Sequence, residues 1–179
     1  MGIGRIFDRI QRKIAEYSTS DQKVKYFRKQ GMKIGKLCHL ETMSFSTEPY
    51  LVEIGDHVAI ANGTVFITHD GGISCFRDDF PGDDVFGKIT IGNNVHIGIN
   101  CTVLPNTEIG NNCIVGAGSV LRGRYPDDSV IVGNPATVIM SISTQKFLYK
   151  VNPNRLHTEE LSDPDKKPIV IKHFASHKQ

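Results

Sequence analysis

The sequence predicts an all-β fold, a parallel β-helix of hexapeptide repeats with a short helical segment before it and a tail after it. An aliphatic residue recurs every six residues through most of residues 34–126. The residue four places after it is small in five of the six hexads between 91 and 126, and the chain contains 17 glycines in 179 residues. A period of six fits neither an α-helix nor a hairpin, but it fits a triangular coil in which each hexad supplies one strand and one corner.

The first 33 residues are predicted to form a helical segment. Apolar residues recur at spacings of three and four from Ile3 to Tyr17, which predicts an amphipathic α-helix. Its other face mixes Arg and Lys with Asp and Glu, a pattern that suits either a membrane surface or packing on the rest of the chain, and we expect packing. A second helix is expected over residues 21–30, with Ser20 as its N-cap and Gly31 as its stop.

The central domain is predicted to span residues 34–140 and to contain about five coils. Aliphatic residues eighteen apart, such as Ile91 and Ile109, should stack on the same wall of successive coils. The frequent corners explain the glycines, because glycine adopts a positive φ without steric cost and Asn and Asp tolerate it best. The clearest hexads begin at Ile91, Ile97, Val103, Ile109, Val115 and Leu121.

The repeat is interrupted over residues 70–88, where the sequence DGGISCFRDDFPGDDVFGK has no hexad phase and contains four aspartates besides its first residue. Long insertions in compact folds are uncommon and are usually functional. We therefore expect an extended acidic loop that projects from one coil. Beyond the β-helix, residues 141–179 are expected to form a helix near 143–151 and then a loose tail.

Composition excludes several classes of function. The net charge is only +2 and no basic block is present, so no nucleic-acid partner is expected. The longest apolar runs are too short to span a bilayer, so we expect a cytoplasmic protein without membrane association. The four cysteines form no C-x-x-C pair, which argues against a zinc knuckle or a thioredoxin-like motif.

Three stretches of the sequence resemble a known family. They are EPYLVEIGDHVAIANGTVFITHDGG, KITIGNNVHIGINCTVLPNTEIGNNCIVGAGSV and VGNPATVI. They resemble the hexapeptide-repeat acyltransferases with a left-handed β-helix, specifically maltose and galactoside O-acetyltransferases and the O-acetyltransferases of bacterial surface polysaccharides. The resemblance implies an acetyl-CoA-dependent O-acetyltransferase that needs no metal and modifies a hydroxyl of a sugar or a surface polysaccharide precursor. It also implies a homotrimer with active sites between adjacent subunits.

The resemblance assigns roles to particular residues. His69, at the point where the loop departs, matches the family's general base, a role that suits imidazole because its unperturbed pKa is closest to neutral. The N–H that stabilises the oxyanion would come from Gly98 or Ile99. Glu48 and Asp70 are candidates for binding acceptor hydroxyls. The expected acetyl-CoA site comprises Gly98, Ile99, Gly116, Ala117 and Gly118 along the pantetheine arm, with Arg122 and Arg124 as candidates for the phosphates.

The sequence is also compatible with other functions. One is N-acetylation of an amino sugar, free or nucleotide-linked, because the sequence does not distinguish a hydroxyl from an amine acceptor. A γ-type carbonic anhydrase would need three histidines around zinc, and no suitable pair lies between His96 and His157. A non-catalytic β-helix used as an assembly module would leave His69, the loop and the Gly-Ala-Gly segment without a purpose. The acceptor, the modified group and the acyl chain length are not determined by the sequence.

Overall fold

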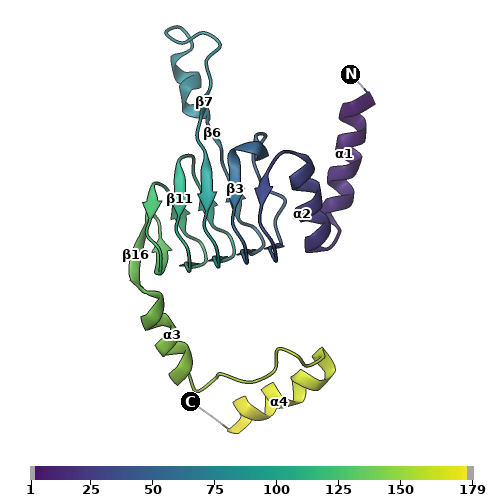
Figure 1. The fold of residues 1–179 in the computed structure, drawn as a ribbon, viewed down its shortest axis with the longest axis vertical. Coiled ribbons are helices and arrows are strands. Elements are labelled where there is room, and N and C mark those ends of the chain that lie inside the picture. Colours follow the sequence, from purple (N-terminus) through teal and green to yellow (C-terminus); the bar gives the residue numbers. More distant parts are fainter. Residues whose placement is uncertain (1–2, 177–179) are drawn as a thin grey trace. The chain divides into compact units, whose positions relative to one another are not determined.

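The computed structural model describes the backbone of residues 3–176 and the side chains of residues 9–176. The chain divides into two compact units, Met1–Ile142 and Ser143–Gln179. The first unit contains two helices and a parallel β-helix, and the second contains two further helices (Figure 1).

Two helices precede the first strand, as the sequence predicts. They are α1 (Ile3–Glu16) and α2 (Ser20–Lys29), and α2 ends where Gly31 adopts a φ of +89°. The predicted N-cap is wrong by one residue. Thr19 occupies the cap position, whereas Ser20 is already helical and its Oγ accepts a hydrogen bond of 2.7 Å from the Leu40 N–H. The hydroxyl is thus used to attach the helix to the first coil.

The expectation that the apolar stripe of α1 packs against the protein is wrong for the part that the structure describes. Ile10, Ile14 and Tyr17 are all exposed, and Ala15 is the buried residue among the described side chains of the helix. Ala15 belongs to the buried core, and it lines a groove together with residues of α2. Three further members of the stripe, Ile3, Ile6 and Phe7, lie outside the described side chains.

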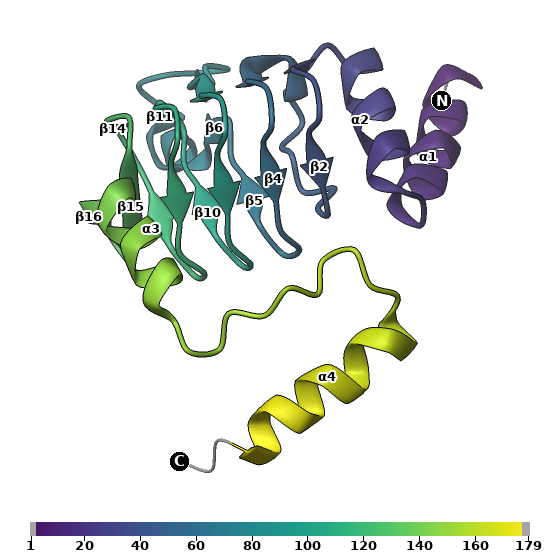
Figure 2. The same cartoon turned by 60° about the horizontal axis from the view of Figure 1, so that its bottom comes forward.

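Three walls of short parallel strands form the β-helix, and Figure 2 shows the strands of successive coils side by side. Wall A contains β1 (Lys33–Ile34), β3 (Val52–Ile54), β8 (Ile89–Ile91), β11 (Thr107–Ile109) and β14 (Arg124–Tyr125). Wall B contains β2 (His39–Leu40), β4 (Ala59–Ile60), β9 (His96–Ile97), β12 (Ile114–Val115), β15 (Ser129–Gly133) and β16 (Ala136–Ser141). Wall C contains β5 (Val65–Phe66), β10 (Thr102–Val103) and β13 (Val120–Leu121).

The hexad assignment is confirmed by register and burial, except at its last hexad. Ile91 pairs with Ile109 on wall A, eighteen residues later, as expected. All six first-position aliphatics of the central hexads are buried, and so are the fifth-position residues, because each hexad has one inward position on its wall and one near its corner. The hexad that begins at Leu121 is two residues short, since Tyr125 pairs with Ile109 and takes the first position of wall A that the period assigns to residue 127. The buried fifth-position residues are Val95, Cys101, Thr107, Cys113 and Ser119.

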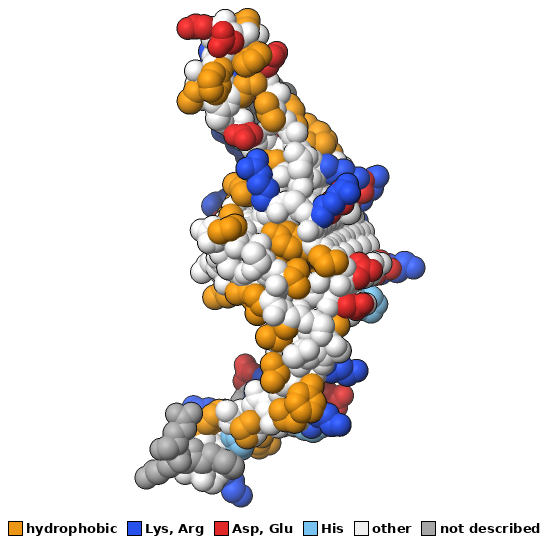
Figure 3. Space-filling view, turned by 90° about the vertical axis from the view of Figure 1, so that its left-hand side faces the viewer, with side chains coloured by type: hydrophobic (Ala, Val, Ile, Leu, Met, Phe, Trp, Pro, Cys, Tyr) orange, Lys and Arg blue, Asp and Glu red, His pale blue; other side chains and the backbone are white. Residues whose placement is uncertain are grey.

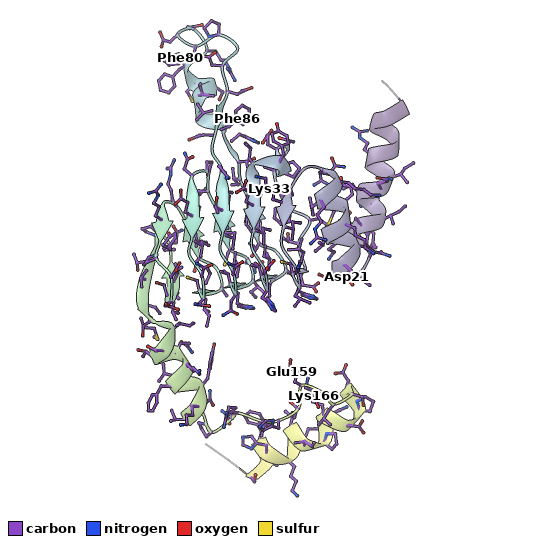
Figure 4. The ribbon with its side chains drawn as sticks, in the orientation of Figure 1. Asp21, Lys33, Phe80, Phe86, Glu159 and Lys166 are labelled. Atoms are coloured by element: carbon purple, nitrogen blue, oxygen red, sulfur yellow. The ribbon has the colours of Figure 1, made fainter. Side chains whose placement is uncertain are left out.

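The insertion forms a projecting hairpin rather than an unstructured loop. Strands β6 (His69–Asp70) and β7 (Val85–Phe86) pair antiparallel at its base, and a 3-10 helix, η2 (Gly71–Phe76), follows β6. Figure 4 labels Phe86 near this base and Phe80 farther out. In the space-filling view of Figure 3, apolar and acidic side chains gather on the hairpin at the top of the picture. The hairpin leaves the coil at the corner between walls C and A.

The β-helix ends in a change of strand direction. Strands β15 and β16 are antiparallel, so the last strand folds back along wall B instead of starting another coil. Two helices belong to the second unit, α3 (Ile142–Val151) and α4 (Asp163–Ser176). The first residue of α3, Ile142, is the last residue of the first unit. We expected an irregular tail after the first of these helices, and this expectation is wrong for the residues that form α4. Acidic residues in its first turn and a hydrogen bond from the Ser162 hydroxyl to Asp165 favour the helix start.

No helix in the described part of the chain is long and apolar enough to cross a membrane.

Candidate active site

Glu48 and His69 form the centre of the candidate site. Glu48 immediately precedes a 3-10 turn, η1 (Pro49–Leu51), and His69 is the first residue of the hairpin. Nδ1 of His69 lies 3.0 Å from Oε2 of Glu48 and 3.1 Å from Oγ of Ser46. The histidine side chain is 44% exposed and the glutamate side chain only 13% exposed, so the carboxylate lies behind the imidazole as seen from solvent.

The carboxylate is held in its ionised form. Burial raises the pKa of Glu48, but hydrogen bonds from Thr47, His69 and Thr68 lower it to about 2. An ionised carboxylate only accepts hydrogen bonds, so the proton of the neutral imidazole must sit on Nδ1. Nε2 then carries the lone pair, and no partner for Nε2 is found among the described residues. In this arrangement Nε2 of the neutral imidazole can accept a proton.

Two hollows meet at His69. One of about 310 Å³ lies under the hairpin and is lined by Glu48, Asp70, Arg77 and Phe86 as well as the histidine. The other, of about 460 Å³, lies along wall C and is lined by Ser46, Val65 and Arg12 of α1. The histidine therefore separates two spaces, which suits a group that must meet two reactants.

The glycine-rich candidates for the acetyl-CoA arm come together in one place. Gly98 and Ile99 stack on Gly116, Ala117 and Gly118 of the next coil, and the Gly118 N–H donates to the Ile99 carbonyl at 2.9 Å. A Cβ on Gly98 would lie 2.7 Å from the backbone nitrogen of Ala117. This stack forms the corner between walls B and C, which we call the B–C corner.

The backbone N–H groups at this corner are not equivalent. The Gly98 N–H already donates to the Val115 carbonyl at 2.9 Å, as part of the stacking of the coils. In contrast, the Ile99 N–H has no acceptor among the described residues, and its side chain is exposed. Of the two expected oxyanion donors, only the Ile99 N–H is free to bind a ligand.

The remaining candidates lie at a different corner. Arg122 follows β13 in the sequence, and Arg124 lies in β14, so both are near the corner between walls C and A. The Arg124 guanidinium is paired with Glu108 at 3.0 Å, whereas no ion pair is found for Arg122 in the described part of the chain. Asp70 is engaged locally, since its side chain accepts a hydrogen bond from the Gly72 N–H at 2.9 Å and caps η2.

Within one chain, the structure does not bring the base and the B–C corner together. His69 follows β5 at the far end of wall C, while Ile99 precedes β10 at the near end of the same wall. The strand of wall C thus separates the two expected parts of the site. A second copy of the chain is one means of bringing an equivalent corner next to His69.

Several site residues were not anticipated from the sequence. Ser46 and Thr68 contact the Glu48–His69 pair, while Arg12, Arg77 and Phe86 line the two hollows. The stacking of successive coils could have indicated Ser46 and Thr68. Phe45 forms a parallel β-bridge with Phe66, and this pairing places Ser46 near His69. Arg12 approaches from a helix, and no repeat pattern predicts that contact.

The described residues contain no cluster of three or more His, Cys, Asp or Glu side chains with the geometry to hold a metal ion. The three-histidine arrangement that a γ-type carbonic anhydrase requires is therefore not formed by this part of a single chain.

Comparison with known proteins gives a consistent result. Residues 88–123 match the family model "Bacterial transferase hexapeptide (six repeats)". The chain is 41% identical to Protein CapG of Staphylococcus aureus over 165 residues, which covers 90% of this chain and 93% of that protein. It is 34% identical over 107 residues to the putative lipopolysaccharide biosynthesis O-acetyl transferase WbbJ of Escherichia coli, which covers 55% of each chain, so this chain spans about half of that relative.

Solved structures share the fold. The hexapeptide-repeat containing acetyltransferase VCA0836 of Vibrio cholerae superposes with a TM-score of 0.63 and 20% identity, covering 77% of this chain and 90% of that one. The structure of VCA0836 complexed with acetyl coenzyme A superposes with a TM-score of 0.52 and 20% identity, covering 75% of this chain and 84% of that one.

Proposed function

The chain belongs to the hexapeptide-repeat acyltransferase family, and from this premise we propose that it transfers an acetyl group from acetyl-CoA to a hydroxyl of a sugar or surface polysaccharide precursor. The observation that carries the proposal is the Glu48–His69 pair, with Nδ1 protonated and Nε2 open to the hollows on either side. WbbJ is described as an O-acetyl transferase of lipopolysaccharide biosynthesis, and its similarity supports a glycan acceptor. VCA0836 has been solved with acetyl coenzyme A, and its shared fold supports that donor.

In the proposed mechanism, Nε2 of His69 removes the proton from the acceptor hydroxyl as its oxygen attacks the thioester carbonyl carbon. The new C–O bond forms, the carbonyl π electrons move onto oxygen, and a tetrahedral intermediate results. When it collapses, the C–S bond breaks, and the imidazolium returns its proton to the departing CoA thiolate. Glu48 stays ionised throughout and stabilises the imidazolium, as a carboxylate behind a catalytic histidine does.

The oxyanion of the intermediate needs a positioned donor, and of the two expected donors, Gly98 and Ile99, the Ile99 N–H is the one without an acceptor among the described residues. We propose that Gly98, Gly116, Ala117 and Gly118 line the pantetheine arm, because a corner without large side chains lets an extended chain lie along the backbone. In this proposal Arg122 is a better candidate than Arg124 for binding the phosphates of CoA, because the Arg124 guanidinium forms an ion pair with Glu108.

We further propose that the site is completed in a homotrimer with left-handed coils, as the family resemblance implies. The separation of His69 from Ile99 by the width of wall C supports this arrangement, because a B–C corner of an adjacent subunit can face His69 where that of the same chain cannot. Asp70 remains a proposed acceptor contact, although its cap on η2 also gives it a structural role.

The test is release of the free CoA thiol from acetyl-CoA with a panel of sugars, amino sugars and glycan fragments. We expect turnover with a hydroxyl acceptor and a loss of about a hundredfold or more in His69→Ala. His39→Ala is the matched control, because His39 is an exposed histidine that lines neither hollow, and it should retain full activity. Unchanged turnover in His69→Ala would refute the base, and turnover with amino sugars alone would refute hydroxyl transfer.

A further inference from the structure

The strongest feature outside the site is the exposed apolar face of α1. Ile10, Ile14 and Tyr17 are 52%, 63% and 80% exposed. Their spacing of four and three residues places them on one face of the helix, with Tyr17 just past its end. Exposed large apolar side chains are common singly, but three aligned on one face indicate a binding surface.

Of these three apolar residues, Ile14 alone borders the groove between α1 and α2. The groove between the two helices, of about 270 Å³, is lined on the α1 side by Gln11, Ala15 and Ser18, whose spacing is again four and three, together with Ile14. Gln11, Ala15 and Ser18 directly follow Ile10, Ile14 and Tyr17 in the sequence. One residue corresponds to a rotation of about 100° around the helix axis. The apolar face is thus turned away from the packed face by about a quarter turn.

Positive charge is concentrated in the same part of the chain. Residues 1–33 contain nine Lys and Arg against three Asp and Glu, a net charge of +6, so residues 34–179 carry −4 of the chain's total of +2. Lys25 and Lys29 of α2 line the groove beside Ile14, are exposed, and make no ion pair with the described residues. Nζ of Lys13 lies 5.4 Å from the centre of the Tyr17 ring.

We propose that α1, with Lys25 and Lys29, binds the surface of an anionic phospholipid membrane. The helix lies in the plane of the interface, Ile10 and Ile14 enter the acyl boundary, and the cations contact phosphate groups. Tyr17 and Lys13 combine an apolar body with a polar tip, which suits the headgroup level. The net charge of +6 in residues 1–33 beside these apolar side chains favours an anionic lipid surface as the partner.

The location of α1 gives the binding a consequence. Arg12 of this helix lines the hollow beside His69, so a membrane held by α1 lies near the candidate site. This step rests on the proposed acetyltransferase function, and it makes a glycan carried on a lipid the acceptor class presented to the site. The lipid binding itself does not depend on that function.

The experiment is sedimentation of the full chain with vesicles of pure phosphatidylcholine or of phosphatidylcholine mixed with phosphatidylglycerol. We expect at least about tenfold stronger binding to the anionic vesicles, reduced when the salt concentration is raised. The double variant Ile10→Gln, Ile14→Gln should bind them about tenfold or more weakly. Ile169→Gln, Ile171→Gln on α4 is the matched control, because it removes two exposed isoleucines from another helix, and it should bind like the parent.

Three results would overturn the proposal. The first is that the parent chain does not bind anionic vesicles. The second is that the two double variants lose vesicle binding equally. The third is that, without lipid, the α1 variant has a lower mass than the parent in sedimentation equilibrium. The last result would show that a second copy of the chain covers the apolar face. Turnover of a water-soluble acceptor by the α1 variant at the parent rate separates a failure of lipid binding from a failure of the proposed acetyltransferase function.

Discussion

Glu48 and His69 are 21 residues apart in the sequence, and Oε2 of the glutamate accepts a hydrogen bond of 3.0 Å from Nδ1 of the histidine. The sequence suggested an acceptor-binding role for this carboxylate, whereas the structure surrounds it with Thr47, Thr68 and the imidazole. A carboxylate with these partners has little capacity left for a sugar hydroxyl. We therefore propose that Glu48 is a positioning residue that sets the tautomer of the base.

Replacing Glu48 with Gln should lower kcat about tenfold to a hundredfold with little change in the KM for either substrate. The amide can present either its oxygen or its NH2 group to Nδ1, so the tautomer with a free lone pair on Nε2 is no longer enforced, and the imidazolium loses its counter-charge. Steady-state kinetics with acetyl-CoA measure both parameters. Glu53→Gln, which removes an outer-wall carboxylate paired with Lys33 and Lys88, is the control and should behave as the parent.

Ionised Glu48 should also make stability depend on pH. Its pKa is lowered on folding from an ordinary 4.5 to about 2, so its contribution is complete above about pH 4.5 and is lost as the pH falls towards 2. The contribution at neutral pH is about 3 kcal/mol, on the scale of 1.36 kcal/mol for each pKa unit. Urea unfolding of the parent and Glu48→Gln at pH 7 and pH 3 measures it. A stability difference as large at pH 3 as at pH 7 would contradict the assignment.

Replacing Gly98 with Ala should destabilise the fold by about 2 kcal/mol or more, because the new methyl group meets the Ala117 backbone of the next coil. Backbone atoms of a stacked coil cannot move aside as a flexible side chain does. Gly71→Ala is the matched control, since a Cβ there meets nothing within 4 Å, and its unfolding midpoint should be unchanged. Equal midpoints for both variants would show that the B–C corner is not closely packed.

Phe86 should contribute to acceptor binding rather than to folding. It pairs with His69 across the base of the hairpin, lines the hollow beside Glu48 and is half exposed. We expect Phe86→Ala to raise the acceptor KM about tenfold, as the loss of an apolar stacking surface would. Phe80→Ala, at a hairpin position that does not line this hollow, should leave the KM unchanged, so a similar rise in both variants would refute the specific role of Phe86.

Different parts of the molecule were predictable for different reasons. The coils between residues 89 and 121 follow the hexad period closely, since each inward position is decided by the residues within its own hexad. The two N-terminal helices were also predictable, but the face that α1 uses was not. Hydrophobic periodicity identifies the apolar side of a helix, whereas Ala15 is the buried residue among the described side chains of α1 and Ile10, Ile14 and Tyr17 stay exposed.

The sequence by itself determined that the chain winds into stacked triangular coils, that a hairpin interrupts them at His69, and that the residues resemble those of an acyltransferase. Only the tertiary structure decided that Glu48 supports His69 and that the Ile99 N–H, not that of Gly98, is free. The physical reason is stacking. In the regular coils, paired residues are eighteen positions apart in the sequence. The stretch after Leu40 is irregular, and there Phe45 pairs with Phe66 at a separation of 21. The hexad period alone does not predict this change of register.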